Sequence, residues 1–357
     1  MAKPQKGSHL PSKSARHPAA TIGSGIFTFL VLICVGGLFA ARYGERAFNG
    51  PGPLTQEKAV VIPRGAGIRD MADTLEKAGV IDNWFTFLAG LKLTKPTANM
   101  QAGEYLFKPG QSMASVIDTI SSGKVIQYSV TIPEGLTSQQ VVARLMENDM
   151  LAGTPSVPLE GTLLPETYRV VRGMSREALL KEMAEAQQKV VRLAWERRAP
   201  GLPLRTPQDL VTLASIVEKE TGQADERPKV AAVFINRLNK KMKLQSDPTI
   251  IYGIVGGRGS LGRPITRTDI STATAYNTYA IDGLPPGPIS NPGKDAILAV
   301  ANPPKTSDLF FVADGTGGHA FAETLADHNK NVARWRAIEA GSRAGAPASP
   351  GAPAAAN

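Results

Sequence analysis

The chain has 357 residues, of which 42% are hydrophobic, and a formal net charge of +9. This length allows two domains with packed cores, and the scattered excess of Lys and Arg, without a basic stripe interleaved with aromatics, argues against nucleic-acid binding. The only cysteine, Cys34, excludes an intrachain disulfide, so an exported domain of this chain must be held together by packing alone.

The N-terminal part of the sequence predicts a membrane anchor. Residues 1–21 are rich in Lys, Ser and Pro, which is typical of a disordered tail. Residues 22–41 carry no charge and are long enough to cross a bilayer as one helix. A cleaved signal peptide is the alternative, but the apolar run is too long and no A-x-A-like site follows it. Four unopposed cations place the N-terminus in the cytoplasm and everything after the helix outside: Lys3, Lys6, Lys13 and Arg16.

A repeated pattern follows a linker at residues 42–57. Within residues 58–150, three segments read as a strand, a Pro/Gly turn and a short amphipathic helix, with the turns at residues 62–65, 108–110 and 132–135. The pattern predicts a small α+β module. Its topology resembles the LysM peptidoglycan-binding module, and a spacer between the membrane and the second domain is the alternative.

Residues 155–340 predict a mainly helical second domain, which makes the fold class α+β. A turn and strand at 160–170 precede a long helix at 176–197, and two further helices contain residues 213–222 and begin near 225–228. We expect loops at 244–254 and 275–293, a helix at 294–301, a β-hairpin from strands 309–312 and 319–321, and a last helix from 324 to about 340. Residues 341–357 predict a disordered tail.

Glu218 is the candidate catalytic acid. Small residues lie one helical turn on either side of it and would leave room for a bulky substrate: Ala214, Ser215, Thr221 and Gly222. A salt-bridged helix carboxylate is the alternative interpretation. Glu220 lies roughly 200° further around the helix, so we expect it not to pair with Glu218. Its neighbours Lys219, Arg227 and Lys229 indicate a surface ion pair instead.

Amide, hydroxyl and aromatic side chains that suit sugar binding follow in the same domain. The candidate substrate-binding residues are Asn236, Gln245, Ser246, Asp247, Thr249, Tyr252, Tyr276, Asn277 and Tyr279, with Thr278 beside them. The alternative is that Asp247 and Pro248 only turn the chain and that the tyrosines fill the core.

Other chemistries lack their motifs. The sequence has no HExxH, CxxC, GxSxG or Walker A pattern. His9 and His17 fall on the cytoplasmic side, which leaves only His319 and His328, and His319 is expected to hydrogen-bond across the hairpin. We therefore expect no metal and no cofactor, and acid/base chemistry by a carboxylate.

Six segments together resemble one known family. ASIVEKE, VFINRL, LQSDPTIIYG, AYNTY, GLPPGPISNPG and FVADGTGGHAF occur in order between about Ile62 and Trp335, and this string is similar to the YceG-like (MltG) family of membrane-bound endolytic murein transglycosylases. The resemblance implies cleavage within nascent peptidoglycan strands by a single catalytic Glu, which falls on Glu218. It also implies an inner-membrane location, synthase partners and a role in ending strand elongation. The family's EGYLFPDTY is EGTLLPETY here, so Thr162 and Leu164 replace two aromatics.

One carboxyl suffices for the implied reaction. Protonated Glu218 would donate to the glycosidic oxygen between N-acetylmuramic acid and N-acetylglucosamine, and the muramic 6-hydroxyl would then attack the anomeric carbon to give a 1,6-anhydro end. The alternative enzyme is a hydrolytic muramidase that uses Asp247 or Asp269 as the second carboxylate. The non-enzymatic alternative is a membrane-tethered glycan-binding scaffold.

Overall fold

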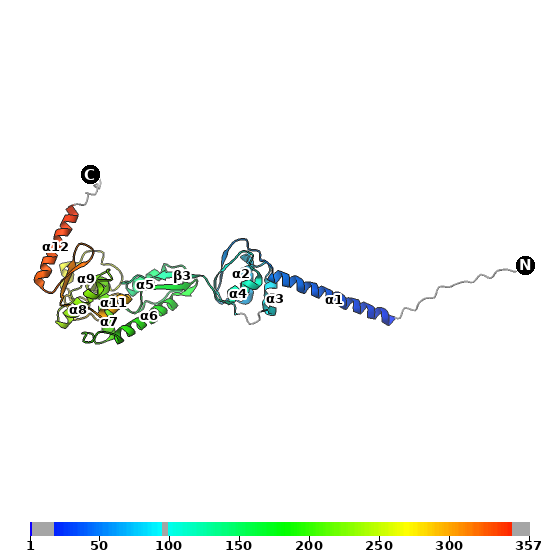
Figure 1. Cartoon of the computed structure of the whole chain (residues 1–357), viewed down its shortest axis with the longest axis horizontal. Helices are drawn as coiled ribbons and strands as arrows, with labels where there is room; N and C mark the ends of the chain where they lie inside the picture. The colour runs from blue at the N-terminus through cyan, green and yellow to red at the C-terminus, as the bar shows by residue number, and fades with distance from the viewer. Residues whose placement is uncertain (2–17, 95–98, 345–357) are drawn as a thin grey trace. The chain divides into compact units, whose positions relative to one another are not determined.

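The computed structural model describes Met1, residues 18–94 and residues 99–344 (Figure 1). The chain divides into two compact units, residues 1–126 and residues 127–357. Both contain helices and short two-stranded sheets, which confirms the α+β class. The predicted tails at 1–21 and 341–357 lie largely outside the described residues.

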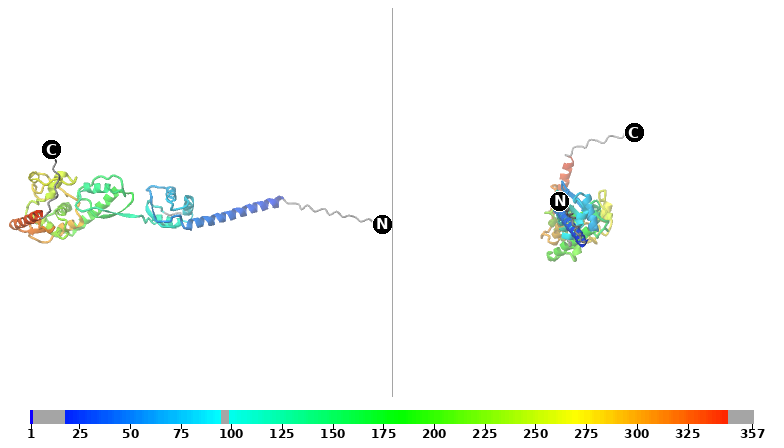
Figure 2. Two further views of the ribbon diagram at one scale, coloured as in Figure 1. Left: turned by 90° about the horizontal axis from the view of Figure 1, so that it is seen from above. Right: turned by 90° about the vertical axis from the view of Figure 1, so that its right-hand side faces the viewer.

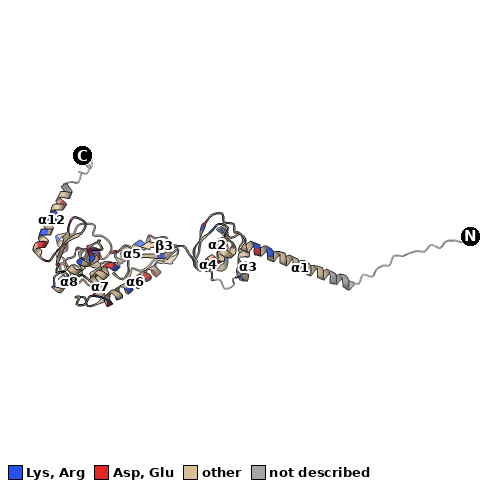
Figure 3. Cartoon of the chain, in the orientation of Figure 1, with Lys and Arg blue, Asp and Glu red and all other residues tan. Residues whose placement is uncertain are grey.

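The first unit begins with α1 (Pro18–Asn49), a single unbroken helix (Figures 1 and 2). Its segment from Gly25 to Asn49 is long and apolar enough to cross a membrane. Figure 3 shows Lys, Arg, Asp and Glu only toward its C-terminal end among the described residues. The predicted linker at 42–57 is helical as far as Asn49. The reason is Phe48, which is 5% exposed and packs against Gly90, where a Cβ would collide with its ring.

Two of the three predicted strand–turn–helix repeats form the core of the first unit. β1 (Lys58–Ile62) pairs antiparallel with β2 (Gly103–Phe107), and the strands lead into α2 (Ile68–Lys77) and α4 (Met113–Ser121). The additional helix α3 (Trp84–Thr94), which the sequence pattern did not reveal, completes the core. Gly79 and Gly123 follow α2 and α4 with φ of 71° and 65°, as expected of helix-ending glycines.

The third repeat belongs to the second unit. β3 (Gln127–Thr131) pairs antiparallel with β5 (Thr167–Val171), and α5 (Ser138–Met146) shares a core with α6 (Arg176–Glu196). A two-residue parallel pair joins β4 (Leu151–Ala152) to β6 (Met174–Ser175). The domain boundary expected at 150–155 therefore falls inside this unit, because β3 takes its partner from the sequence after that boundary.

The helical part of the second unit surrounds a separate core made mainly by α6, α7, α8 and α11. Its elements are α7 (Pro207–Glu220), α8 (Arg227–Asn239), α9 (Asp247–Val255), α10 (Arg267–Ser271), α11 (Lys294–Ala301), β7 (Phe310–Ala313), β8 (His319–Ala322) and α12 (Leu325–Ala344). The predicted hairpin is confirmed by the antiparallel pairing of β7 with β8. The loop predicted at 244–254 is wrong, because Pro248 starts α9 and left-handed Gly256 ends it.

Candidate active site

The last turn of α7 brings two carboxyl groups out of the core on different faces. Thr206 caps the start of the helix by accepting a hydrogen bond from the Asp209 backbone N–H at 3.1 Å. Eight consecutive buried residues, 210–217, then anchor the helix on all sides. Glu218 and Glu220 follow directly, so a rigid scaffold sets the position of both.

Glu218 is locked into a buried ion-pair network. Its side chain is 4% exposed. Its Oε1 accepts a bond from Arg227 Nη2 at 3.1 Å, and its Oε2 accepts one from the Gly293 backbone N–H at 3.0 Å. Arg227 Nη2 also donates to Glu134 at 2.7 Å. Burial raises the pKa of Glu218, while the Gly293 bond and Arg227 act against this rise. Both carboxylate oxygens are thus committed within the protein.

Three of the four small residues beside Glu218 are buried and do not open a substrate path. Ala214 and Ser215 are fully buried, and Thr221 is 4% exposed. Ser215 Oγ instead accepts a bond from the Ile289 backbone N–H at 3.0 Å. Gly135 also packs over the Glu218 side chain. Ala214, Ser215 and Thr221 therefore leave no room for a sugar, which corrects that part of the expectation, whereas Gly222 is exposed and has open space where its Cβ would lie.

Glu220 lines a cavity of about 320 Å³. The other lining residues are Phe234, Arg237, Leu244, Gln245, Asp247, Tyr279, Phe311 and His328. The Glu220 carboxylate accepts a bond from Ser246 Oγ at 2.5 Å. Burial raises the pKa of Glu220, the Ser246 bond lowers it and the negative charge of Asp247 raises it further. The expected surface ion pair with Arg227 is wrong, because that guanidinium binds Glu218 and Glu134.

Three of the predicted substrate-binding residues line this cavity, namely Gln245, Asp247 and Tyr279. Asp247 accepts a bond from the Tyr279 hydroxyl at 2.7 Å, and Gln245 Oε1 accepts one from Arg237 at 3.2 Å. Gln245 has a positive φ of 55°, which is uncommon for a residue with a side chain. Ser246 connects this group to Glu220. Strained backbone of this kind is frequent where side chains are aimed at a ligand.

Arg237 and His328 are cavity residues that the sequence analysis missed. Arg237 donates to the carbonyl oxygens of Leu244 and Leu309 at 3.0 and 2.7 Å, and so fixes two walls. His328 Nδ1 is buried and has no hydrogen-bond partner among the described residues. Burial and nearby Arg237 lower the pKa of His328, which favours a neutral ring. Arg237 was visible in the VFINRL segment, but nothing in the sequence linked His328 to it.

Three predicted binding residues hold the protein together instead. The Asn236 amide donates to the carbonyl oxygens of Thr306 and Asp308, both at 3.0 Å. Thr249 is fully buried and donates to the Ser246 carbonyl at 2.6 Å. Asn277 is fully buried and donates to three backbone carbonyls of the 269–272 turn. Their polar groups satisfy backbone groups, and none of the three residues lines the cavity beside Glu220.

Tyr252 and Tyr276 do not line the cavity beside Glu220. Tyr252 lines a second cavity of about 360 Å³, together with Lys219 and Pro248. The rings of Tyr252 and Tyr276 are 4.8 Å apart between centroids. The Tyr252 hydroxyl donates to Glu160 at 3.3 Å, and burial of both groups raises both pKa values. The tyrosines thus divide between two cavities, with Tyr279 in the first and Tyr252 in the second.

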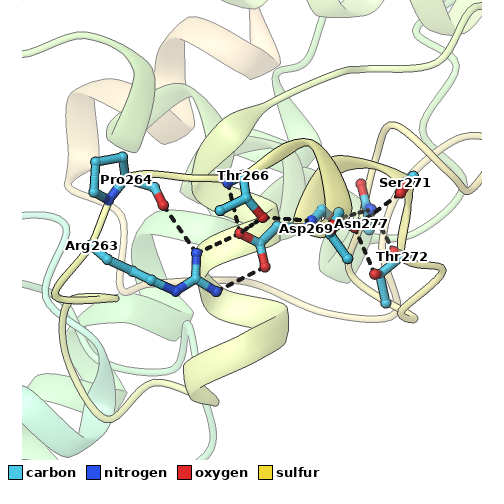
Figure 4. A network of polar contacts seen from close by, with 8 residues as sticks. Arg263, Pro264, Thr266, Asp269, Ser271, Thr272 and Asn277 are labelled. Atoms are coloured by element: carbon cyan, nitrogen blue, oxygen red, sulfur yellow. Dashed lines mark hydrogen bonds and ion pairs between the residues drawn. The ribbon is translucent and has the colours of Figure 1, made fainter.

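Asp269, one candidate second carboxylate, is occupied by a structural network (Figure 4). Its oxygens accept two bonds from Arg263 at 2.6 and 2.9 Å and one from the Thr266 backbone N–H at 2.7 Å. The Arg263 bond, followed by the Thr266 bonds, holds the pKa of Asp269 well below its ordinary value. Asp269 also completes the capping box of α10. Asp247 is the carboxylate that shares a cavity with Glu220.

His319 lies in β8, as predicted, but its partner is not the facing strand. Its Nδ1 is 2.6 Å from Glu226 Oε2, and its backbone N–H donates to Glu226 Oε1 at 2.8 Å. Glu226 is the residue before α8, so this contact ties the hairpin to the start of that helix.

Comparison with known proteins identifies relatives over most of the chain. The YceG-like family profile matches residues 60–334. A Streptococcus pneumoniae R6 protein named endolytic murein transglycosylase is 30% identical over 85% of this chain and 63% of its own length. A Bacillus subtilis protein of the same name is 30% identical over 75% of this chain and 82% of its own length. The chain thus spans less than two thirds of the pneumococcal relative.

Among solved structures, a crystal structure of a putative YceG-like protein from Listeria monocytogenes is 31% identical to this chain. It matches with a TM-score of 0.47 and covers 77% of this chain and 99% of the Listeria chain.

Proposed function

The chain belongs to the YceG-like family, and on this premise we propose that it is an endolytic lytic transglycosylase of murein. It would cleave the bond between N-acetylmuramic acid and N-acetylglucosamine within glycan strands. The observation that carries the proposal is a carboxyl with a raised pKa, Glu220, in a cavity that is also lined by Gln245, Asp247 and Tyr279.

We assign the acid/base role to Glu220 in preference to Glu218. A catalytic acid must reach the substrate and must be able to lose and regain its proton. Glu220 lines the 320 Å³ cavity, and its carboxylate accepts a hydrogen bond from the neutral Ser246 hydroxyl. Glu218 bonds to a buried guanidinium and to a backbone N–H. Glu218 remains the rival assignment because burial raises its pKa as well.

The proposed reaction needs no water. Protonated Glu220 donates its proton to the glycosidic oxygen as the bond from that oxygen to the muramic C1 breaks. The resulting carboxylate accepts the proton of the muramic 6-hydroxyl, whose oxygen forms a bond to C1. The products are a 1,6-anhydromuramic end and a free hydroxyl on the released sugar. Glu220 ends the cycle protonated, ready for another strand.

The groups around Glu220 suit these steps. Burial raises the pKa of Glu220, Asp247 raises it further, and the Asp247 carboxylate could balance positive charge that develops at C1. Tyr279 holds Asp247 in place through the 2.7 Å bond. The Gln245 amide lines the same cavity and offers hydrogen bonds for sugar hydroxyls.

A hydrolytic muramidase is the second candidate, because Asp247 lies in the same cavity as Glu220 and could activate a water. Asp269 lacks this support, since Arg263 and Thr266 occupy its oxygens. A membrane-tethered scaffold that binds glycan without cleaving it is the non-enzymatic candidate.

We further propose that α1 anchors the protein in the bacterial inner membrane, with the N-terminus in the cytoplasm and the cavities outside. The uncharged part of α1 and the cations before it support this orientation. The first unit would then act as a LysM-like glycan-binding module or as a spacer. The partners of the protein would be membrane-bound peptidoglycan synthases, and the enzyme would terminate the nascent strands that these synthases make.

Mass spectrometry of the products tests the proposed reaction. The full chain in detergent micelles is incubated with purified murein, and the ends of the released fragments are identified. Anhydro ends are expected. Reducing ends would identify a muramidase, and binding without fragments would identify a scaffold.

A further inference from the structure

The linings of the two cavities include two pairs of consecutive residues. Glu220 and Asp247 line the first cavity, whereas their chain neighbours Lys219 and Pro248 line the second. Consecutive Cα atoms are about 3.8 Å apart. The last turn of α7 and the first turn of α9 thus contribute residues to both cavities.

The lining of the second cavity combines apolar surface with polar groups. Pro248, Ile251 and Val255 give it an apolar wall, and Tyr252 contributes an aromatic ring. Thr137 and Gln140 come from the N-terminal turn of α5, and the 257–260 turn closes another side. Aromatic and aliphatic surface against the ring faces, with amides and hydroxyls at the edges, is the composition that sugar units require.

Lys219 adds a positive charge that forms no ion pair with a carboxylate among the described residues. Its Nζ donates to the neutral Gly135 carbonyl at 3.3 Å. The nearby Glu218 is already paired with Arg227. Glu160 lies behind Gly257, but Ser138, Asn291 and Tyr252 bond to its oxygens, and burial raises its pKa. Lys219 is thus the charged group that a ligand in this cavity would meet.

We propose that the second cavity is a subsite for the muramic unit next to the cleaved bond, and that Lys219 recognises the carboxylate which this unit bears. The inference rests on the proposed function. The carboxylate belongs to the lactyl group where the strand is bare, or to the attached peptide where the strand carries one. A chitin-like strand has the same sugar backbone but no carboxylate, so Lys219 would discriminate murein from neutral amino-sugar polymers.

Equilibrium binding to the full chain in detergent micelles tests this subsite without turnover. The Glu220→Gln background is used, and the absence of cleavage is checked on the same samples. Three probes of equal length are compared: strands stripped to the lactyl carboxylate, strands that carry peptides, and chitin oligomers. Lys219→Gln is expected to lower the affinity for carboxylate-bearing strands roughly three- to tenfold and to leave the affinity for chitin oligomers unchanged. If the affinity for stripped strands falls, the lactyl carboxylate is the group that Lys219 binds. If only the affinity for peptide-bearing strands falls, the group is a carboxylate of the peptide.

Two further variants make the test specific. Ser260→Glu places an anion at the exposed rim of the cavity and is expected to lower the affinity for the carboxylate-bearing strands. Lys181→Gln removes an exposed cation from α6, where it pairs with Glu185, and is expected to change nothing. Raising the salt concentration should narrow the difference between Lys219→Gln and its parent.

Unchanged affinity of Lys219→Gln for every strand would overturn the subsite alone. An equal loss for chitin oligomers would also overturn it, because the effect would not depend on the carboxylate. If the unaltered chain bound none of the probes, the proposed function would fall with it. A Lys219-dependent preference without anhydro products would leave the subsite standing and remove the proposed reaction.

Discussion

The two faces of the last turn of α7 show how tertiary contacts give two carboxyls of one helix different tasks. On one face, the 132–135 turn and the residues before α11 close over Glu218, and Arg227 neutralises it. On the other face, Glu220 borders a cavity and bonds to a hydroxyl. Burial raises both pKa values. A raised pKa therefore does not by itself assign the catalytic acid, and the proposal of Glu220 rests on the cavity that this residue lines.

The largest expected effect is a loss of turnover when Glu220 is replaced. Glu220→Gln should reduce kcat by about 10² to 10⁴, because the amide keeps the shape but cannot exchange a proton. Strand binding and the melting temperature should stay close to those of the unaltered chain. Steady-state kinetics, calorimetric binding and thermal unfolding on the same sample check this. Turnover within a few-fold of normal would contradict the assignment of Glu220.

Replacement of Glu218 should mainly lower the stability of the protein. Glu218→Gln leaves the buried Arg227 with one half-exposed partner, Glu134, so the free energy of unfolding should fall by about 3 kcal/mol. Turnover per folded molecule should fall less than about tenfold, since Glu220 is unchanged. Chemical denaturation and active-site titration separate the two quantities. Unaltered stability together with abolished turnover would return the catalytic role to Glu218.

The pH dependence should sharpen the comparison through the neighbours of Glu220. The first step needs the protonated acid, so kcat/KM should fall as pH rises through the raised pKa of Glu220, above the ordinary value of 4.5. Asp247→Asn removes a charge that raises this pKa and should move the falling limb to lower pH. Ser246→Ala removes a hydrogen bond that lowers the pKa of Glu220 and should move the falling limb to higher pH. Shifts in the same direction would show that another group controls the limb.

The smallest expected effect concerns the outer member of the closed face. The Glu134 side chain is 37% exposed, and Glu218 remains as the partner of Arg227 when Glu134 is lost. Glu134→Gln should therefore lower the free energy of unfolding by less than about 1 kcal/mol. A double-mutant cycle with Arg227→Met compares its coupling with that of Glu218. A larger coupling for Glu134 would mean that Glu218 is not the main partner.

Local sequence signals predicted most elements correctly, because caps and apolar periodicity act over a few residues. The bounds of α6 and α11 and the hairpin of β7 with β8 were anticipated in this way. α9 was mistaken for a loop because its Thr and Tyr residues outweighed two helix signals, Pro248 and Gly256. The pairing of β3 with β5 could not be inferred either, since the three repeats look alike in sequence while pairing depends on distant residues.

The choice between Glu218 and Glu220 also lay beyond the sequence. The helical period shows that they face different directions, but not which direction is covered. The cover on Glu218 comes from residues about 80 positions before it and 75 after it, through Lys219 to Gly135 and Glu218 to Gly293. Small neighbours such as Ser215 are equally suited to a substrate and to packed backbone. In this chain the backbone near Ile289 occupies that space.

The most direct test compares the two faces in one experiment. Full chains with Glu218→Gln or Glu220→Gln are incubated with the same murein, and anhydro ends are counted per folded molecule by mass spectrometry. Anhydro ends should form with the Glu218 variant and be absent with the Glu220 variant. The reverse result would contradict the account and identify Glu218 as the acid.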